Sequence, residues 1–555
     1  MLTAFRWMVR IVTGLVLLTL LIGWVAYYVL SRSLPDYDED FTLPGISAPV
    51  EIVRNNANVP HIFGKSEADV FFALGFVHAQ DRLWQMAMLR RTAQGKLSEI
   101  FGARTVKIDE LLRRLDIYTL AQQSVAAQDA RTKTVLDAYA AGVNAWITQV
   151  NAGARGRGAP EFFLFSNEIS AWSAADSIAI IKLMALDLSS HLETEVQRAQ
   201  LSQILSPERL ADILPDDPTQ GVMALPPYAS LMPGPFAPPA KTQMAYIDAP
   251  MSPFHSRDFA GASNAFAALP SRSAAGGSLL ANDPHLGLTA PSIWYLARLQ
   301  LPTGGIIGGT IPGMPLMLVG RSDKMGWGLT SSYIDDQDVV MERVNPANTE
   351  EYLTPEGPKP FRTEQTIITV KDADPVTITQ RWSESGPILP GSHYDLDSVT
   401  PPGAVAALEW TALSAADTSM TAGLQLMTSQ SVAEAMEAGR LFVAPSQNLT
   451  LADGTTIALQ TIGAIPARDV SHVTKGRMPA PGWEGKNRWT GVQPYEQNPR
   501  EVNPASGITF YQDAAVLAST ATASASYAAM ENGAAAVEIG SINGGTVLYG
   551  NGTYG

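Results

Sequence analysis

The sequence has 555 residues, too many for one simple core, and its 46% hydrophobic and 16% charged content is that of a globular protein with two or more packed units. The net charge of −15, from 38 Lys+Arg against 53 Asp+Glu, argues against nucleic acid as a partner. The chain has no cysteine, which excludes disulfides, cysteine-ligated metals and a thiol nucleophile.

Residues 1–33 have the composition of an export segment. Arg6 and Arg10 precede an apolar run from Ile11 to Leu30, and about 20 apolar residues are enough to span a bilayer. No small-residue cleavage site follows, so we favour an uncleaved anchor in the inner membrane over a cleaved signal peptide. A buried core helix is the weakest alternative, because the run has no charged face. In either favoured case we expect a periplasmic or other extracytoplasmic body.

Residues 34–205 are predicted to be mostly helical after a linker and two short strands. In the first predicted helix, the apolar spacing of Ala68, Phe72 and Phe76 indicates an amphipathic pattern. His78 and Asp81 of that helix are predicted to be packing and capping groups. The predicted strands cover Val50–Val53 and Val59–Phe63, and the helical stretches cover Ser66–Phe101, Asp109–Val150 and Ala174 to about Leu205.

The next 57 residues, 206–262, differ sharply in composition. Ten prolines between Pro215 and Pro253 make a sustained helix or sheet improbable there. A structureless segment of this length inside a compact domain is usually a linker or functional, and a removable spacer fits it.

From Ser263 to Ile508 the sequence is strand-rich with Gly/Pro turns, which indicates stacked sheets. One helix is predicted over Ser431–Phe442. The predicted strands are Ser278–Ala281, Ile293–Leu301, Met314–Val319, Gln337–Val344, Glu364–Val370 and Val376–Trp382.

Residues 509–555 form a tail of a different kind. No Lys or Arg follows Arg500, and Ala514–Gly555 is mostly Ala, Ser, Thr and Gly. Because such a segment lacks large apolar groups for a core of its own, we expect poor order there.

Ser263, in Gly261-Ala262-Ser263-Asn264, is the candidate nucleophile. If the peptide bond before Ser263 were cut, this one residue would carry both a hydroxyl nucleophile and a free α-amine as its base. The pKa of an α-amine is about 7.7–8.0, near the optimum for a general base at neutral pH.

Several motifs together resemble the penicillin acylase family of N-terminal-nucleophile (Ntn) hydrolases, over about residues 48–508. The α-chain-like segments are Val59-Pro60-His61-Ile62, Gly75-Phe76-x-His78-Ala79-Gln80-Asp81-Arg82-Leu83-x-Gln85-Met86 and Arg90-Arg91-x-Ala93-x-Gly95-x-Leu97. The β-chain-like segments are Ala262-Ser263-Asn264-Ala265-Phe266, Asn282-Asp283-Pro284-His285-Leu286, Pro291-x-x-Trp294-Tyr295, Ile311-Pro312-Gly313-x-Pro315 and Gly320-Arg321-x-Asp323-x-x-Gly326-Trp327-Gly328.

The resemblance implies an α+β fold, the αββα sandwich of Ntn hydrolases, and a precursor that cuts itself before Ser263 and loses the spacer. The resulting α and β chains would remain together as a heterodimer. It further implies that His285 lies beside the Ser263 hydroxyl and that the backbone N–H of Ser331 stabilises the oxyanion. The implied activity is hydrolysis of N-acyl amides, with acyl homoserine lactones, β-lactam side-chain amides and related amides as candidate substrates.

A structural Ca²⁺ site is also implied by the resemblance. Asp335 and Asp338 would supply carboxylates and Gln337 its carbonyl, and oxygen-only ligation suits Ca²⁺. Glu195 is the expected ligand from the α-chain region, with Glu193 as the alternative. A solvated acidic turn is the other interpretation of Asp335-Asp336-Gln337-Asp338.

The sequence departs from the family near its end. Asn503-Pro504-Ala505-Ser506-Gly507-Ile508 resembles the segment that leads to the family's second oxyanion donor, an Asn, but Asp513 occupies that position here. A carboxylate would repel an oxyanion unless protonated. The alternative hypothesis is therefore a truncated or frameshifted, catalytically silent precursor. A Ser-His-Asp hydrolase is a weaker third hypothesis, because no G-x-S-x-G elbow surrounds Ser263.

Overall fold

The computed structural model describes residues 2–153, 158–165, 169–213, 225–232, 263–274, 276–284, 286, 289–332, 334–512, 536–542 and 545–550. His285, Asp513 and most of the predicted spacer lie outside these residues.

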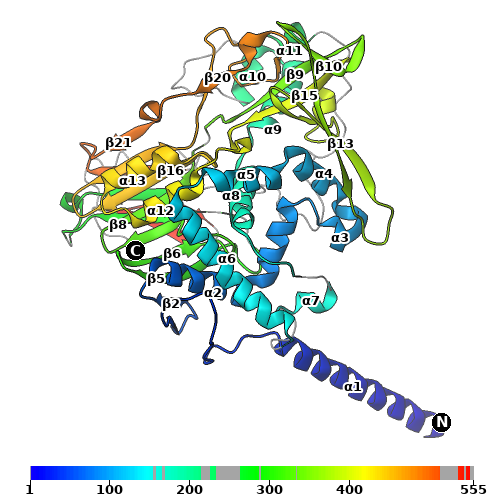
Figure 1. Ribbon diagram of the computed structural model, residues 1–555, viewed down its shortest axis with the longest axis vertical. Helices are drawn as coiled ribbons and strands as arrows, with labels where there is room; N and C mark the ends of the chain where they lie inside the picture. The colour runs from blue at the N-terminus through cyan, green and yellow to red at the C-terminus, as the bar shows by residue number, and fades with distance from the viewer. Residues whose placement is uncertain are drawn as a thin grey trace.

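Helix α1 (Leu2–Ser31) extends away from the rest of the molecule (Figure 1). Its segment Leu2–Tyr28 is long and apolar enough to cross a membrane, and none of it is buried against the protein. An N-terminal signal sequence has the same properties, so the helix is compatible with either an anchor or a signal.

The predicted helical region is present, divided into shorter helices by specific polar groups. Helix α2 begins after Ser66, whose hydroxyl accepts a hydrogen bond from the Asp69 N–H (3.1 Å). It ends at Ala93, where Gly95 has a positive φ of 59° and the Lys96 N–H donates back to the Arg91 carbonyl (2.9 Å). The buried Asp109 carboxylate accepts the N–H groups of Leu97 and Ser98 (2.9 and 2.7 Å) at the start of the next turn. The helices are α2 (Glu67–Ala93), α3 (Ser98–Phe101), α4 (Val106–Leu115), α5 (Ile117–Ala127), α6 (Ala130–Asn151), α7 (Glu161–Leu164), α8 (Ala174–Leu188), α9 (His191–Ser202), α10 (Pro207–Ile213) and α11 (Tyr228–Leu231).

Helices α2 and α6 pack at backbone distance. A Cβ at Gly142 would lie 1.8 Å from the Phe72 carbonyl oxygen, so only glycine permits this approach. The pair belongs to the main hydrophobic core, which continues into α8.

The large sheet has nine strands, antiparallel except for the parallel pair β2–β5. Its order is β1 (Glu51–Arg54), β2 (Pro60–Phe63), β5 (Tyr295–Leu301), β6 (Gly304–Thr310), β7 (Val319–Ser322), β8 (Met325–Ser331), β16 (Gln447–Asp453), β17 (Ile457–Ile462) and β21 (Arg500–Val502). Thus strands from before and after the predicted spacer share one sheet.

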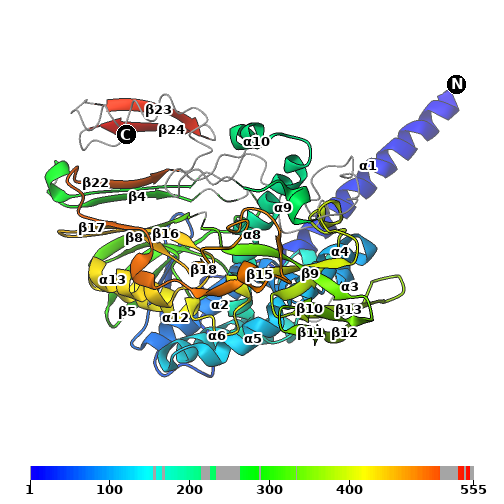
Figure 2. The same ribbon diagram turned by 90° about the horizontal axis from the view of Figure 1, so that it is seen from above.

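A three-stranded sheet, β22 (Ile508–Gln512), β3 (Asn264–Ala268) and β4 (Leu279–Asp283), stacks on the part of the large sheet formed by β8, β16 and β17 (Figure 2). Ala267 and Leu280 pack there against Ala452 and Ile457. Helices α12 (Ser419–Thr428) and α13 (Val432–Ala438) lie on the opposite face of the large sheet (Figure 2). One helical layer and two stacked sheets are therefore present. Within the described ranges no helix forms the fourth layer of the expected αββα sandwich.

A further sheet of eight strands lies beside α3 and α4 (Figure 2). Its order is β11 (Gly357–Pro360), β10 (Asn348–Thr354), β9 (Gln337–Asn345), β15 (Ala404–Trp410), β14 (Gly386–Leu389), β13 (Val376–Ser383) and β12 (Arg362–Ile368), with β19 (Ala480–Pro481) paired to β9. Two small pairs complete the strands, β18 (Pro466–Arg468) with β20 (Trp489–Val492) and β23 (Ala536–Ile542) with β24 (Gly545–Gly550).

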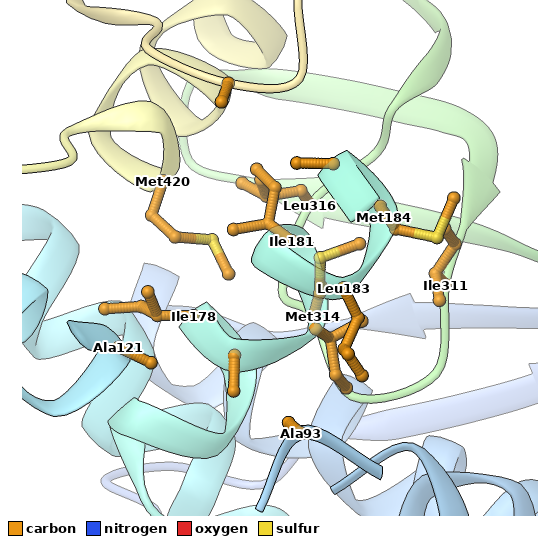
Figure 3. Close-up of a cluster of buried hydrophobic side chains, with 14 of the residues drawn as sticks. Ala93, Ala121, Ile178, Ile181, Leu183, Met184, Ile311, Met314, Leu316 and Met420 are labelled. Atoms are coloured by element: carbon orange, nitrogen blue, oxygen red, sulfur yellow. The ribbon is translucent and has the colours of Figure 1, made fainter. Parts of the chain in front are cut away.

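One predicted strand is wrong. Most of the predicted strand Met314–Val319 is a loop, because Pro312 and Pro315 interrupt strand pairing and the apolar side chains face the helical core. Figure 3 shows Met314 and Leu316 among Ile181, Leu183 and other side chains of α8. Thr509–Gln512 pair with β3, so strand pairing continues past Ile508. Of Ala514–Gly555, where the composition predicts poor order, the structure describes only residues 536–542 and 545–550.

Candidate active site

Ser263 lies immediately before β3, the central strand of the three-stranded sheet, and is only 8% exposed. Strand β3 pairs with β4 on one side and β22 on the other, in the registers Asn264↔Asp283 and Asn264↔Gln512. The predicted nucleophile is therefore placed at the end of a strand held on both sides.

Ser331 is the last residue of β8, in the other sheet, and its carbonyl accepts a hydrogen bond from Asn448 Nδ2 (3.2 Å). The carboxamide of Asn282 connects the two strands, donating from Nδ2 to the carbonyl of Asn264 (2.9 Å) and to that of Leu329 (3.0 Å). The residue after Ser263 and the residue two before Ser331 are therefore both hydrogen-bonded to the Asn282 side chain. The arrangement brings a hydroxyl and a strand end with backbone N–H groups into the same region.

Three carboxylates from distant parts of the sequence form a second cluster. Oxygen atoms of Glu195 in α9 and of Asp335 and Asp338 around the start of β9 all lie within 4.8 Å of one another. Glu195, not Glu193, belongs to this cluster. Side chains two positions apart in a helix point in nearly opposite directions, which explains why only one of these glutamates faces the aspartates.

Backbone donors and a guanidinium surround the cluster. The Val339 N–H donates to both Glu195 carboxylate oxygens (3.2 Å each), and Trp489 Nε1 donates to Asp338 (2.8 Å). Arg468 Nε donates to Asp338 Oδ2 (2.9 Å), and its Nη2 lies 3.3 Å from Asp335 Oδ2. Arg468 and Trp489 could not be recognised from the sequence, because they belong to the short strand pair β18–β20 and follow no recognisable spacing.

Burial and the mutual repulsion of these carboxylates shift the pKa values of two of them. Burial, reinforced by the charges of Asp338 and Asp335, raises the pKa of Glu195 well above its usual range. Burial also raises the pKa of Asp335, although Arg468 opposes this shift. Asp335 Oδ1 is buried and accepts no hydrogen bond from the described residues. Gln337 is buried, and its side-chain oxygen accepts the Leu192 N–H (3.0 Å), which joins α9 to β9.

His78 and Asp81 are packing groups, as the sequence predicted. His78 is fully buried, its Nδ1 lies 2.7 Å from the Tyr139 hydroxyl, and burial together with Arg82 lowers its pKa to about 3. Asp81 forms an ion pair with Arg54 (2.8 Å) and accepts a hydrogen bond from Tyr295 (2.6 Å). Both residues join α2 to neighbouring elements.

Comparison with known proteins gives consistent relatives. The chain is 30% identical over 489 residues to an acyl-homoserine lactone acylase QuiP of Pseudomonas syringae pv. tomato, covering 83% of this chain and 55% of that protein. It is 28% identical over 487 residues to the penicillin acylase 2 proenzyme of Pseudomonas sp. strain SE83, covering 86% of this chain and 60% of that protein. The chain therefore spans little more than half the length of these relatives.

A solved structure, the thermostable penicillin G acylase of Alcaligenes faecalis in its orthorhombic form, is similar with a TM-score of 0.40 and 22% identity, covering 45% of this chain and 43% of that one. The penicillin amidase family profile matches residues 49–533, which include the helical region, Ser263 and the carboxylate cluster. The chain therefore belongs to the penicillin amidase family.

Proposed function

We propose that the chain is an exported acylase that hydrolyses N-acyl amides through Ser263 after cutting itself before that residue. The observation that carries this proposal is the position of Ser263, at the start of a central strand and joined through Asn282 to the strand that ends at Ser331. Family membership supports the reaction class.

The reaction follows from the groups on Ser263. Its freed α-amine takes the hydroxyl proton as Oγ attacks the acyl carbonyl, giving a tetrahedral intermediate. The Ser331 N–H donates to the oxyanion, and His285, which lies outside the described residues, is the proposed assisting group. The amine then leaves with a proton, and water hydrolyses the acyl-enzyme to regenerate Ser263.

The two chains produced by cleavage would stay together. Lys182 in α8 and Asp417 before α12 form a buried ion pair (2.9 Å), and the lysine also donates to the Ala412 carbonyl (2.9 Å). The large sheet also combines strands from both sides of the cleavage point. A heterodimer of α and β chains is therefore the proposed product.

The carboxylate cluster would hold Ca²⁺. Glu195, Asp335 and Asp338 offer hard oxygen ligands, with the Gln337 carbonyl between the aspartates. Asp335 Oδ1 is buried, accepts no hydrogen bond from the described residues and lies 3.6 Å from His191 Nδ1, and three carboxylates so close together favour a divalent cation. When bound, the ion would neutralise these carboxylates and stabilise the junction of α9 with β9. The catalytic steps above use only residues of the chain.

Export would depend on α1, as a retained anchor or a cleaved signal. The body would then be periplasmic or otherwise extracytoplasmic, where small acyl amides can reach it.

The acyl-homoserine lactone and penicillin acylase names of the relatives define the first substrates to test. The purified chain would be incubated with N-acyl homoserine lactones of increasing acyl length and with penicillin G, and the released amines would be quantified. We expect release by the wild type and by Ser271→Ala, an exposed serine nearby, but not by Ser263→Ala. An uncut wild-type chain that releases nothing would favour the silent-precursor alternative.

A further inference from the structure

Asn282, in β4, uses both ends of its carboxamide across the two stacked sheets. Its Oδ1 accepts the Leu329 N–H (3.2 Å) while its Nδ2 donates to the Leu329 carbonyl (3.0 Å) and to the Asn264 carbonyl (2.9 Å). Only one orientation of the amide satisfies one donor and two acceptors, so the side chain is fixed. Asn282 thus contacts the residue after Ser263 and the residue two before Ser331.

The partner strand is shaped to receive this side chain. A Cβ at Gly328 would lie 2.6 Å from Asn282 Cβ and 2.7 Å from its Cγ, distances that real Cβ atoms do not adopt. Gly328 therefore leaves the space through which the carboxamide reaches the backbone of Leu329.

This contact matters because the nucleophile and the oxyanion donor belong to different sheets. Strand β3 pairs with β4 and β22, whereas β8 pairs with β7 and β16, so their ladders do not fix one strand relative to the other. Apolar packing of Ala267 and Leu280 against the large sheet is not directional. The hydrogen bonds of Asn282 are directional and join the two strands at the level of the reacting groups.

We propose that Asn282 is a positioning residue that sets the distance between the Ser263 hydroxyl and the Ser331 N–H, with Gly328 providing its space. This inference rests on the proposed function. A misplacement of about 1 Å can reduce a rate by about 10²-fold. Loss of the carboxamide is therefore expected to lower kcat by about 10²-fold with KM changed less than about threefold, the pattern of an interaction that matters in the transition state.

The test compares Asn282→Ala with Asn144→Ala in the full chain. Asn144 in α6 makes the same pair of contacts with one backbone residue, accepting the Trp172 N–H (2.6 Å) and donating to its carbonyl (2.9 Å), but lies in the helical region. Self-cleavage would be followed by intact mass. The kcat and KM for an N-acyl homoserine lactone would be measured per cleaved chain. Hydrogen exchange would be followed at residues 263–268 and 329–331.

We expect slower self-cleavage, a lower kcat and faster exchange at both segments in Asn282→Ala only. Asn282→Asp, which keeps the size but turns a carboxylate toward two carbonyls, and Gly328→Ala should reproduce the kcat loss, and they extend the test if the first variant misfolds. Equal kcat in Asn282→Ala and Asn144→Ala would overturn the inference. A wild type that neither cleaves nor hydrolyses would refute the proposed function instead, and unchanged exchange in Asn282→Ala would then overturn the inference by itself.

Discussion

Tyr139 provides a quantitative test of how the helical region is fixed to the strand-rich region. Its buried hydroxyl accepts the Gly313 N–H (2.8 Å) and lies within hydrogen-bond distance of His78 Nδ1 (2.7 Å), so this one oxygen is the partner of both groups. The change Tyr139→Phe removes this oxygen and leaves a buried N–H and a buried imidazole nitrogen without their partner. Each of the two unsatisfied groups costs about 1–3 kcal/mol, so the free energy of unfolding should fall by about 2–6 kcal/mol.

The assay is urea unfolding of the detergent-solubilised chain, followed by tryptophan fluorescence, with the urea dependence (m) compared between variants. The control is Tyr352→Phe, which removes a hydroxyl that accepts only the half-buried Glu384 N–H (3.0 Å) among the described contacts. We expect a loss of about 1 kcal/mol or less for this control. If Tyr139→Phe were no more destabilising than Tyr352→Phe, the hydrogen-bonded link between α2, α6 and the Gly313 loop would not contribute as described.

Three further outcomes follow from buried charges. Arg468→Met leaves Asp338 without its cation and should destabilise the chain by about 3–5 kcal/mol. In thermal unfolding, the melting temperature of this variant should be lower than that of the wild type in EGTA and should partly recover in Ca²⁺. Equal melting temperatures of variant and wild type in EGTA would contradict this. Because the folded-state pKa of Glu195 is raised, its contribution to stability is fully present below the ordinary Glu pKa of about 4.3 and is lost as pH rises through the folded value. The free energy of unfolding of the EGTA-treated chain, measured by urea titration, should therefore fall over that pH range. In Glu195→Gln this pH dependence should be flatter. The lowered pKa of His78, about 3, has the opposite sign, since its contribution is present above the ordinary His pKa of about 6.5 and lost as pH falls toward 3. The full shift corresponds to about 5 kcal/mol, and a His78→Gln chain with an unchanged acid-unfolding profile would contradict it.

Local sequence patterns predicted those helices and strands that are favoured by their own residues. The Ser66 cap and the apolar spacing after it give α2, and the apolar, β-branched segment within Gln337–Val344 gives β9. Strand β6 was missed because Gly304–Thr310 is mostly glycine, and its pairing with β5 and β7 creates the strand. The prediction of a strand over Met314–Val319 was wrong because apolar character alone does not distinguish a strand from a buried loop.

The candidate site shows the same limit. Motif resemblance gave Ser263 and the carboxylates, and the structure brings Glu195 to the aspartates from well over a hundred residues away. Arg468 could not be predicted, because its role depends on how the β18–β20 pair packs. Asn282 lay within a motif, but its function depends on how two sheets stack, which no local pattern encodes.

The central claim is that the chain cuts itself before Ser263. Intact-mass analysis and N-terminal sequencing of the exported protein, beside a Ser263→Ala control, test it most directly. We expect a new chain that begins at Ser263 in the wild type and is absent from the control. A single uncut chain in both would contradict self-cleavage at Ser263 and favour the silent-precursor alternative.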